Sequence, residues 1–292
     1  MENINGIIVI NKPKEYTSHD VVAKVKKILN IKKVGHTGTL DPNATGVLPL
    51  LLNDGTKLSK YLINHDKEYK VILKLGIKTD TADGEGKIVK EESVDFEKLN
   101  QVEETINSFI GKQEQIPPIY SAIKVNGKKL YEYAREGKNV EIKPRNIEIY
   151  DIKLEKIDKE EEEIEFVVLC SKGTYIRSLC EDIAEKLGTV GYMKELERTK
   201  VGEFKLEQSI TIEELEKNLK DLEEHIITME QLLKYEEKIV VEERKLQLFL
   251  NGVMLNLNKK DGIYRIYDVY NNFIGTGIIK SNKLKRDIIL NG

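Results

Sequence analysis

The sequence predicts an α+β protein that consists of one large mixed domain and one small β-rich domain. Stretches with the two-residue period of a strand are interspersed with stretches that have the 3.6-residue period of a helix. After about residue 240 only short β-like segments separated by turn residues remain. The chain has 292 residues, which is enough to bury a large core and exceeds one ordinary domain. We therefore predict domains over residues 1–238 and 239–292.

The first elements are a strand, a loop and a helix. Residues 6–10 (GIIVI) predict a short strand. A helix is expected from about Ser18, whose hydroxyl can cap it. One face of this helix is apolar and carries Val21, Val22, Val25, Ile28 and Leu29. Residues 47–52 predict a buried element that is either a strand or a helix.

The middle of the chain continues the mixed order. Residues 68–75 alternate, so Tyr69, Val71, Leu73 and Leu75 share one face of a strand. The next predicted elements are a helix over 95–110, strands over 147–154 and 163–170, and a helix from Tyr175 to Leu187 that Gly188 ends. An acidic amphipathic stretch over 212–233 is expected to be helical and to close the large domain. The tail segments GIYRIYDVY, FIGTGIIK and DIILNG are predicted strands.

Charge is distributed unevenly along the chain, although the net charge is only −3. Residues 1–80 contain 13 basic against 8 acidic residues, and residues 244–292 contain 9 against 3. The acidic excess is therefore concentrated between them, in runs such as EKIDKEEEEIE. Both ends could contact phosphate groups, or their lysines could simply be solvated side chains on helix surfaces.

Several classes of protein are excluded by the remaining composition. Cys170 and Cys180 are too few for a disulfide framework, and together with the four histidines they show no zinc-site spacing. The N-terminus lacks a signal pattern, and no apolar run reaches the length of a membrane span. We expect a soluble protein of a reducing cytoplasm. The run TDTADGEG (79–86) lacks the ligand order of a calcium loop and predicts a polar hairpin turn.

The most informative segment is GHTGTLDPNATGVLPLLL, residues 35–52, which holds one carboxylate inside a glycine-rich turn. The glycines permit positive φ angles or close backbone approach, and Pro42 fixes φ directly after Asp41. The apolar run that follows anchors the turn. The segment matches neither a dinucleotide fingerprint nor a P-loop. Asp41 is therefore a candidate nucleophile, and the alternative is an ordinary Asp-Pro-Asn turn.

This segment closely resembles the catalytic motif of the bacterial tRNA pseudouridine-55 synthases, the TruB family. Four further strings resemble the family in order, so that the resemblance covers roughly residues 6–200: NKPKEYTSHDVV, KEYKVILKLGIKTDTADGEG, PPIYSAIKVNGKKLYEYAREG and SKGTYIRSLCEDIAEKLG. It implies the pseudouridine synthase fold, with a mixed, largely antiparallel sheet flanked by helices. The tail looks like a small PUA-type RNA-binding domain. The implied activity is isomerisation of uridine 55 in the T loop of tRNA.

The resemblance assigns three catalytic residues, Asp41, Tyr69 and Arg177. Asp41 is the catalytic carboxylate, and Tyr69 stacks on the flipped uracil and is a candidate to relay the C5 proton. From the pattern alone, Tyr69 could equally be a half-buried core tyrosine. Arg177 forms an ion pair with Asp41, for which a bidentate guanidinium is suited. Such a partner would explain a cation in the first turn of a helix, where the helix dipole disfavours it. The alternative is an i,i+4 pair with Glu181.

Four substrate-binding residues follow from the same resemblance. His36 engages the RNA loop, and Tyr175 and Leu196 line the uracil pocket, although both could be plain core residues. Lys12 belongs to a Lys-Pro motif that packs against the catalytic turn. The chain departs from the family at Glu15, where the family usually has glycine.

Residues 117–145 combine lysines and tyrosines in a polar segment, which in the family grips the stem-loop and orders on binding. The reaction breaks the N1–C1′ bond, rotates the base and joins C5 to C1′, after extrusion of the base from the RNA. The carboxylate can act as nucleophile at C1′ or as base at C2′, and no cofactor or metal is required.

We expect the T arm of tRNA as the partner, with no membrane, no obligate protein partner and a monomeric chain. Two other functions remain open at this point. One is a guide-RNA-dependent synthase of the dyskerin type, for which the tail is short. The other is a non-catalytic tRNA-binding protein, which would have no need of a buried carboxylate paired with arginine.

Overall fold

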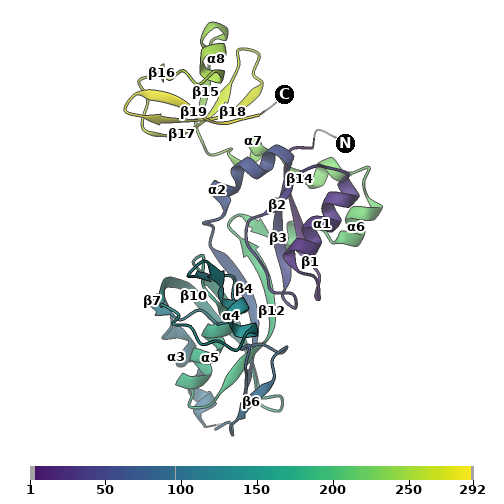
Figure 1. Cartoon of the computed structure of the whole chain (residues 1–292), viewed down its shortest axis with the longest axis vertical. Helices are drawn as coiled ribbons and strands as arrows, with labels where there is room; N and C mark the ends of the chain where they lie inside the picture. The colour runs from purple at the N-terminus through teal and green to yellow at the C-terminus, as the bar shows by residue number, and fades with distance from the viewer. Residues whose placement is uncertain (1–3, 96, 291–292) are drawn as a thin grey trace.

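The computed structural model describes residues 4–95 and 97–290 and contains one large and one small sheet, joined in a single elongated molecule (Figure 1). The large sheet has ten strands, with the main order β14-β1-β3-β12-β4-β11-β10-β7, while β2 pairs with β3 and β13 pairs with β12. Its strands are β1 (Gly6–Lys12), β2 (Val34–His36), β3 (Thr45–Leu52), β4 (Lys67–Leu75), β7 (Gly111–Gln115), β10 (Arg145–Asp158), β11 (Glu163–Cys170), β12 (Gly191–Val201), β13 (Phe204–Lys205) and β14 (Ile226–Ile227). Among the described strands of this large sheet, only the β3–β12 pair is parallel. The predicted α+β class with a largely antiparallel sheet is confirmed.

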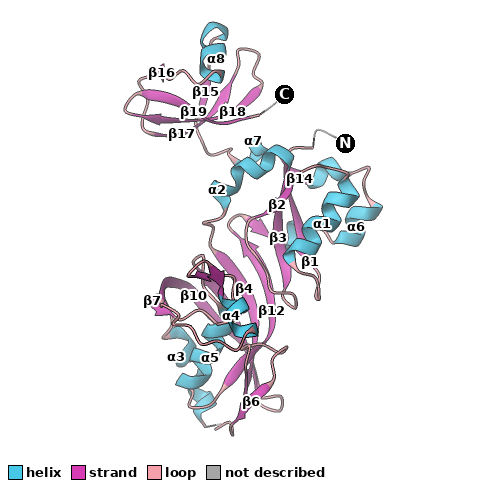
Figure 2. Ribbon diagram, viewed as in Figure 1, coloured by secondary structure: helices cyan, strands magenta, loops and turns pink. Residues whose placement is uncertain are grey.

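Helices cover both ends of this sheet (Figure 2). The first group, α1 (Ser18–Leu29) and α6 (Ile212–Lys217), packs near β1. In the second group α3 (Val102–Asn107) packs on β10, and α5 (Ile176–Lys186) packs on β12 and β4. Strand β1 is buried on both faces, because Ile8 and Ile10 face α1 while Ile7 and Val9 face α2 (Ser59–Leu62) and α7 (Met229–Leu232). Double burial explains why its sequence is an unbroken apolar run rather than an alternating one.

Strand β4 lies between β11 and β12 in the middle of the large sheet. Its residues alternate as the sequence predicted, with Tyr69, Val71, Leu73 and Leu75 all buried in the core that α5 also enters. The predicted strands over 147–154 and 163–170 are β10 and β11, and the helix ended by Gly188 is α5. The pattern thus places Tyr69 on the face toward the first turn of α5.

Three predicted elements differ in the structure. The 95–110 segment forms a 3₁₀ turn (Lys98–Gln101) and then α3, and residue 96 lies outside the described residues. Residues 212–233 do not form one helix but α6, a 3₁₀ turn, β14 and α7. A capping box at Thr228 starts a new helix, and Ile226 and Ile227 pair with β1 instead. The cap of α1 is Thr17 rather than Ser18.

The small sheet has the order β15-β17-β18-β19-β16. Its elements are β15 (Lys238–Val240), α8 (Glu243–Leu250), β16 (Leu255–Asn256), β17 (Gly262–Tyr267), β18 (Phe273–Lys280) and β19 (Lys283–Ile289). It contacts the large unit through Asp287, which accepts hydrogen bonds from Lys60 and Tyr61, and through Ile288, which belongs to the same buried apolar cluster as Leu58. The predicted tail strands GIYRIYDVY and FIGTGIIK correspond to β17 and β18. Of the predicted strand DIILNG, residues 287–289 belong to β19, which already begins at Lys283, and residues 291–292 lie outside the described residues.

Two hairpins project from the large unit. The first is β5 (Ile77–Thr79) with β6 (Ile88–Glu91), so the TDTADGEG run is a hairpin turn as predicted. The second is β8 (Lys124–Val125) with β9 (Lys128–Lys129), followed by α4 (Leu130–Arg135), within the lysine- and tyrosine-rich segment. Within residues 4–95 and 97–290, no helix combines the length and apolarity needed to cross a membrane.

Candidate active site

Asp41 lies in a turn, residues 37–44, that connects β2 to β3. The side chain of Ser18, at the start of α1, holds this turn at Leu40: its hydroxyl accepts from the Leu40 N–H at 2.9 Å and donates to the Leu40 carbonyl at 3.3 Å. The Ala44 N–H closes the turn on the Asp41 carbonyl at 3.1 Å. Ser18 therefore fixes the turn rather than capping its own helix, which leaves the cap to Thr17.

The buried guanidinium of Arg198 supports the same turn from β12. Its side chain is among the largest that are fully buried, and it donates to the carbonyls of Val47 at 2.8 Å, Gly38 at 3.2 Å and Thr39 at 3.4 Å. Gly46 has a φ of 102°, and a Cβ there would lie 2.3 Å from the Arg198 carbonyl oxygen. Only glycine fits this approach of β3 to β12. No local sequence pattern indicated this role of Arg198.

Lys12 has no exposed surface, so its side chain contacts only other parts of the protein. Its ammonium donates to three carbonyls, those of Pro13 at 2.9 Å, Tyr16 at 2.6 Å and Pro42 at 2.7 Å. Burial lowers the pKa of Lys12 to about 8. All three donors are satisfied inside the protein, so Lys12 connects the N-terminal loop to the turn that carries Asp41.

Glu15 occupies the left-handed region with φ of 70°, and its N–H donates to the Pro42 carbonyl at 3.0 Å. The chain thus keeps at this position a conformation that suits glycine. We expect Glu15→Gly to raise the melting temperature by about 2 °C, because relief of backbone strain exceeds the added entropy of the unfolded chain. Calorimetry would measure it, with Lys14→Gly as the control that should not stabilise. A lower melting temperature for Glu15→Gly would contradict this account of the loop.

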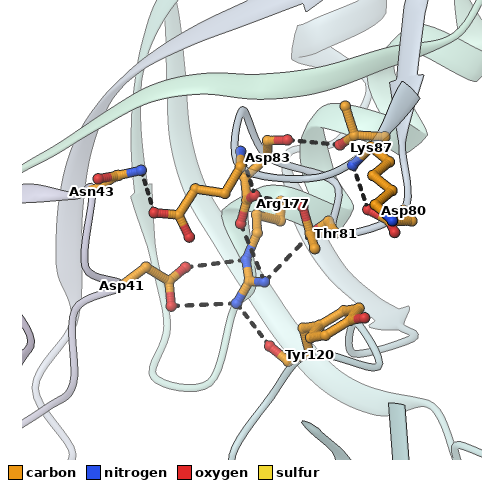
Figure 3. A network of polar contacts seen from close by, with 10 residues as sticks. Asp41, Asn43, Asp80, Thr81, Asp83, Lys87, Tyr120 and Arg177 are labelled. Atoms are coloured by element: carbon orange, nitrogen blue, oxygen red, sulfur yellow. Dashed lines mark hydrogen bonds and ion pairs between the residues drawn. The ribbon is translucent and has the colours of Figure 1, made fainter. Parts of the chain in front are cut away.

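Arg177 joins three segments at the start of α5 (Figure 3). Its Nε lies 3.1 Å from Asp41 Oδ2 and its Nη2 lies 3.3 Å from Asp41 Oδ1, so the pair is bidentate. Nη1 lies 3.5 Å from Asp83 Oδ2, and Nη2 donates to the Tyr120 carbonyl at 3.1 Å. Two carboxylates thus compensate a cation at a helix N-terminus. Glu181 pairs with Lys78 instead, at 3.0 Å, which excludes the i,i+4 alternative.

Asp83 was not predicted as a site residue, because the pattern of its segment indicated only a polar hairpin turn. Its carboxylate contacts Arg177 and lines the same cavity as Asp41. Burial raises the pKa of Asp41 above the usual aspartate range, and the negative charge of Asp83 adds to this, whereas Arg177 opposes it. Two carboxylates sharing one guanidinium therefore compete for its charge.

The pH profile should report this competition. A reaction that needs ionised Asp41 loses rate as pH falls through its pKa, so the acid limb of kcat/KM should lie above the range of a free aspartate. Asp83→Asn should move that limb to lower pH, because removal of a like charge lowers the pKa of Asp41. Asp80→Asn, on the same hairpin, should leave the limb in place. A limb that moved upward in Asp83→Asn would contradict this electrostatic account.

Asp41 opens onto a small cavity of about 100 Å³, lined among others by Tyr69, Tyr175, Arg177, Met193 and Leu196. Tyr69 is 8% exposed, and burial raises its pKa to about 12, so it is a neutral phenol at pH 7. The Asp41 side chain is 38% exposed and remains reachable, whereas that of Arg177 is 7% exposed. A second cavity of about 260 Å³ shares Asp41, Met193 and Leu196 with the first. The predicted residues Asp41, Tyr69, Tyr175, Arg177 and Leu196 thus converge.

His36 lies apart from these residues. It belongs to β2 and does not line the small cavity, and its ring meets the edge of His19 with centroids 5.6 Å apart. Its Nδ1 is buried without a hydrogen-bond partner among the described residues. Burial lowers the pKa of His36, so the imidazole is neutral at pH 7. Among the described residues, no three His, Cys, Asp or Glu side chains group as metal ligands would.

Comparison with known proteins identifies the class of this site. The family model of the TruB pseudouridylate synthase N-terminal domain matches residues 26–176, and that of the tRNA pseudouridylate synthase B C-terminal domain matches residues 177–251. The chain is thus an enzyme of the pseudouridine synthase class. More particularly, it belongs to the TruB family of pseudouridylate synthases.

Individual relatives agree with this assignment. The chain is 48% identical to the tRNA pseudouridine synthase B of Clostridium tetani over 94% of this chain and 95% of that protein. It is 41% identical to the protein of the same name from Caldanaerobacter subterraneus subsp. tengcongensis, over 97% and 98%. Among solved structures it resembles an H/ACA RNP bound to a substrate RNA containing 2'-deoxyuridine, with a TM-score of 0.70, 25% identity and coverage of 98% of this chain and 85% of that one.

Proposed function

We propose that this enzyme isomerises uridine 55 in the T loop of tRNA to pseudouridine, acting as a cytoplasmic monomer without a cofactor. The observation that carries the proposal is the Asp41 carboxylate, held bidentately by Arg177 at the mouth of a cavity lined by Tyr69. A carboxylate so held can attack a sugar carbon while remaining ionised. The tRNA substrate is supported by the full-length match to relatives named tRNA pseudouridine synthase B.

Each residue of the site has a separate role in the proposed reaction. Asp41 acts at the ribose, as nucleophile at C1′ or base at C2′, while the N1–C1′ electron pair leaves with the base. The uracil rotates within the cavity against the rings of Tyr69 and Tyr175, with Leu196 on its wall, and C5 then bonds to C1′. Loss of the C5 proton and protonation of N1 complete an isomerisation that conserves every atom. His36 and the 117–145 segment would engage the RNA outside this cavity.

A guide-RNA-dependent enzyme is the second candidate, since a solved structure similar to this chain is a Cbf5-Nop10-Gar1 complex, with a TM-score of 0.69 and 26% identity. The chain covers 83% of that longer chain but 95% of the tRNA pseudouridine synthase B of Clostridium tetani. The extent of these matches favours an enzyme that recognises tRNA directly, without a guide RNA. An assay without guide RNA separates the two candidates.

The site of modification can be tested with unmodified full-length tRNA that carries tritium at C5 of every uridine. Purified enzyme should release one equivalent of tritium from this tRNA. The matched substrate has cytidine at position 55 and should release none. Release from the cytidine 55 tRNA at the same rate would contradict the choice of uridine 55.

The tail, residues 239–292, is proposed to bind RNA and to take no part in the chemistry. Exposed Lys283 and Lys285 lie on β19, within a segment of net positive charge. The double variant Lys283→Gln/Lys285→Gln should weaken tRNA binding and reduce the slope of log Kd against log salt by about 1 to 2. Turnover at saturating tRNA should stay within about twofold. The control pair Lys153→Gln/Lys156→Gln, on acidic β10, should leave the slope unchanged, and equal slopes in both pairs would contradict this role.

A further inference from the structure

The first turn of α5 begins without a capping side chain of its own. The backbone N–H groups at a helix N-terminus lack intrahelical partners, and Ser, Thr, Asp or Asn usually satisfies one of them. In this chain Thr17, Thr211 and Thr228 do so for α1, α6 and α7, each within a capping box. The corresponding residue of α5 is Tyr175, whose side chain makes no cap.

Tyr175 is one of the residues that line the cavity, so a pocket residue occupies the cap position of α5. Neighbouring polar groups do not replace the missing cap. The Thr174 hydroxyl donates to the Ser171 carbonyl at 3.0 Å. Ser178 occupies the position whose side chain would close a capping box, but its hydroxyl donates to the Ile116 carbonyl at 2.9 Å.

Gln115 closes this helix end from another element. It is the last residue of β7, is 4% exposed, and lies 60 positions before Tyr175. Its Oε1 accepts from the Tyr175 N–H at 2.8 Å, and its Nε2 donates to the Tyr175 carbonyl at 3.0 Å. Both backbone groups of one residue are thus held by one buried amide, which fixes its position and orientation.

We propose that Gln115 is a positioning residue of the active site, whose amide fixes the backbone of Tyr175 and thereby the ring that walls the uracil cavity. The inference rests on the proposed function, since it takes Tyr175 as part of the substrate pocket. Two further hydrogen bonds between the same segments support this inference. The Ser178 hydroxyl donates to the Ile116 carbonyl, and Arg177 donates to the Tyr120 carbonyl. The end of β7 and the start of α5 are therefore fastened together, and small displacements at a reacting centre cost large factors in rate.

Single-turnover tritium release from an unmodified T-stem-loop tests the proposal. Gln115→Met keeps the volume and removes both hydrogen bonds, and we expect the rate to fall by about 10- to 50-fold with hairpin Kd within about threefold. The matched control is Gln113→Met on the same strand, whose amide donates to Phe109 away from the site, and which should stay within about twofold. Gln115→Glu keeps the acceptor and loses the donor, so it should fall between wild type and Gln115→Met. It also carries the test if Gln115→Met does not fold.

A double-mutant cycle separates positioning from stability. If Gln115 acts through the Tyr175 ring, Gln115→Met should change the rate by less than about threefold in a Tyr175→Ala background. A lower melting temperature with an unchanged rate would overturn the proposal, as would a full loss that persists in Tyr175→Ala. An inactive wild type would instead overturn the proposed function, so the two failures are distinguishable.

Discussion

Asp41→Asn is expected to lose turnover by roughly 10³-fold or more while tRNA binding is retained. The change keeps the shape of the side chain but removes the charge that is proposed to attack the ribose or to take its proton. Binding should persist because the lysines proposed to contact phosphate, such as Lys283 and Lys285, lie on β19 and not in the turn that carries Asp41. Tritium release measures the first quantity, and filter binding at fixed salt measures the second.

The matched control is Asp151→Asn, an exposed aspartate on β10, which should be as active as the wild type. Melting temperatures establish that both variants are folded. Appreciable tritium release by Asp41→Asn would remove Asp41 from the chemistry and leave the cavity without its reacting group. Loss of binding in parallel with turnover would instead make Asp41 a residue of RNA recognition.

Arg177→Lys is expected to lower turnover by about 100-fold although the positive charge is kept. Lysine cannot reproduce the two parallel contacts to the Asp41 oxygens, nor reach Asp83 and Tyr120 at the same time. The melting temperature should fall by no more than about 4 °C, because the buried cation still has a carboxylate partner. Single-turnover rates and calorimetry on the same preparation measure both.

The control is Glu181→Gln, which removes only the surface pair with Lys78 and should leave activity intact. A fully active Arg177→Lys enzyme would show that the orientation of Asp41 does not depend on the bidentate pair. The result would then assign Arg177 to helix packing alone.

Much of the fold could be predicted because local patterns and burial agree. The alternation that identified β4 also fixes the face on which Tyr69 lies, and the apolar run of β1 reflects burial on both sides. The prediction of one helix over residues 212–233 was wrong because local pattern and long-range pairing disagree there. The amphipathic pattern of this segment does not show the helix cap at Thr228 that divides it. It also cannot show that Ile226 and Ile227 pair with β1, because that contact is long-range.

The site residues that belong to a sequence motif could be predicted. The prediction was incomplete where side chains from distant segments meet. Asp83 looked like a turn residue, because nothing local reveals a partner on α5. Arg198 and Gln115 act on backbone groups far away in the sequence, so no spacing rule identifies them. The Lys-Pro resemblance placed Lys12 beside the turn that carries Asp41, but no local pattern indicated that three carbonyls enclose its ammonium.

The most direct test of the central claim uses the purified chain alone with an unmodified T-stem-loop that carries C5-tritiated uridine, in buffer containing EDTA and no guide RNA. The structure predicts multiple turnovers, with one tritium released for each hairpin and pseudouridine at the position of uridine 55. Failure to release tritium from this hairpin by folded, RNA-binding enzyme would contradict the claim that Asp41, Arg177 and Tyr69 form a self-sufficient uridine isomerase.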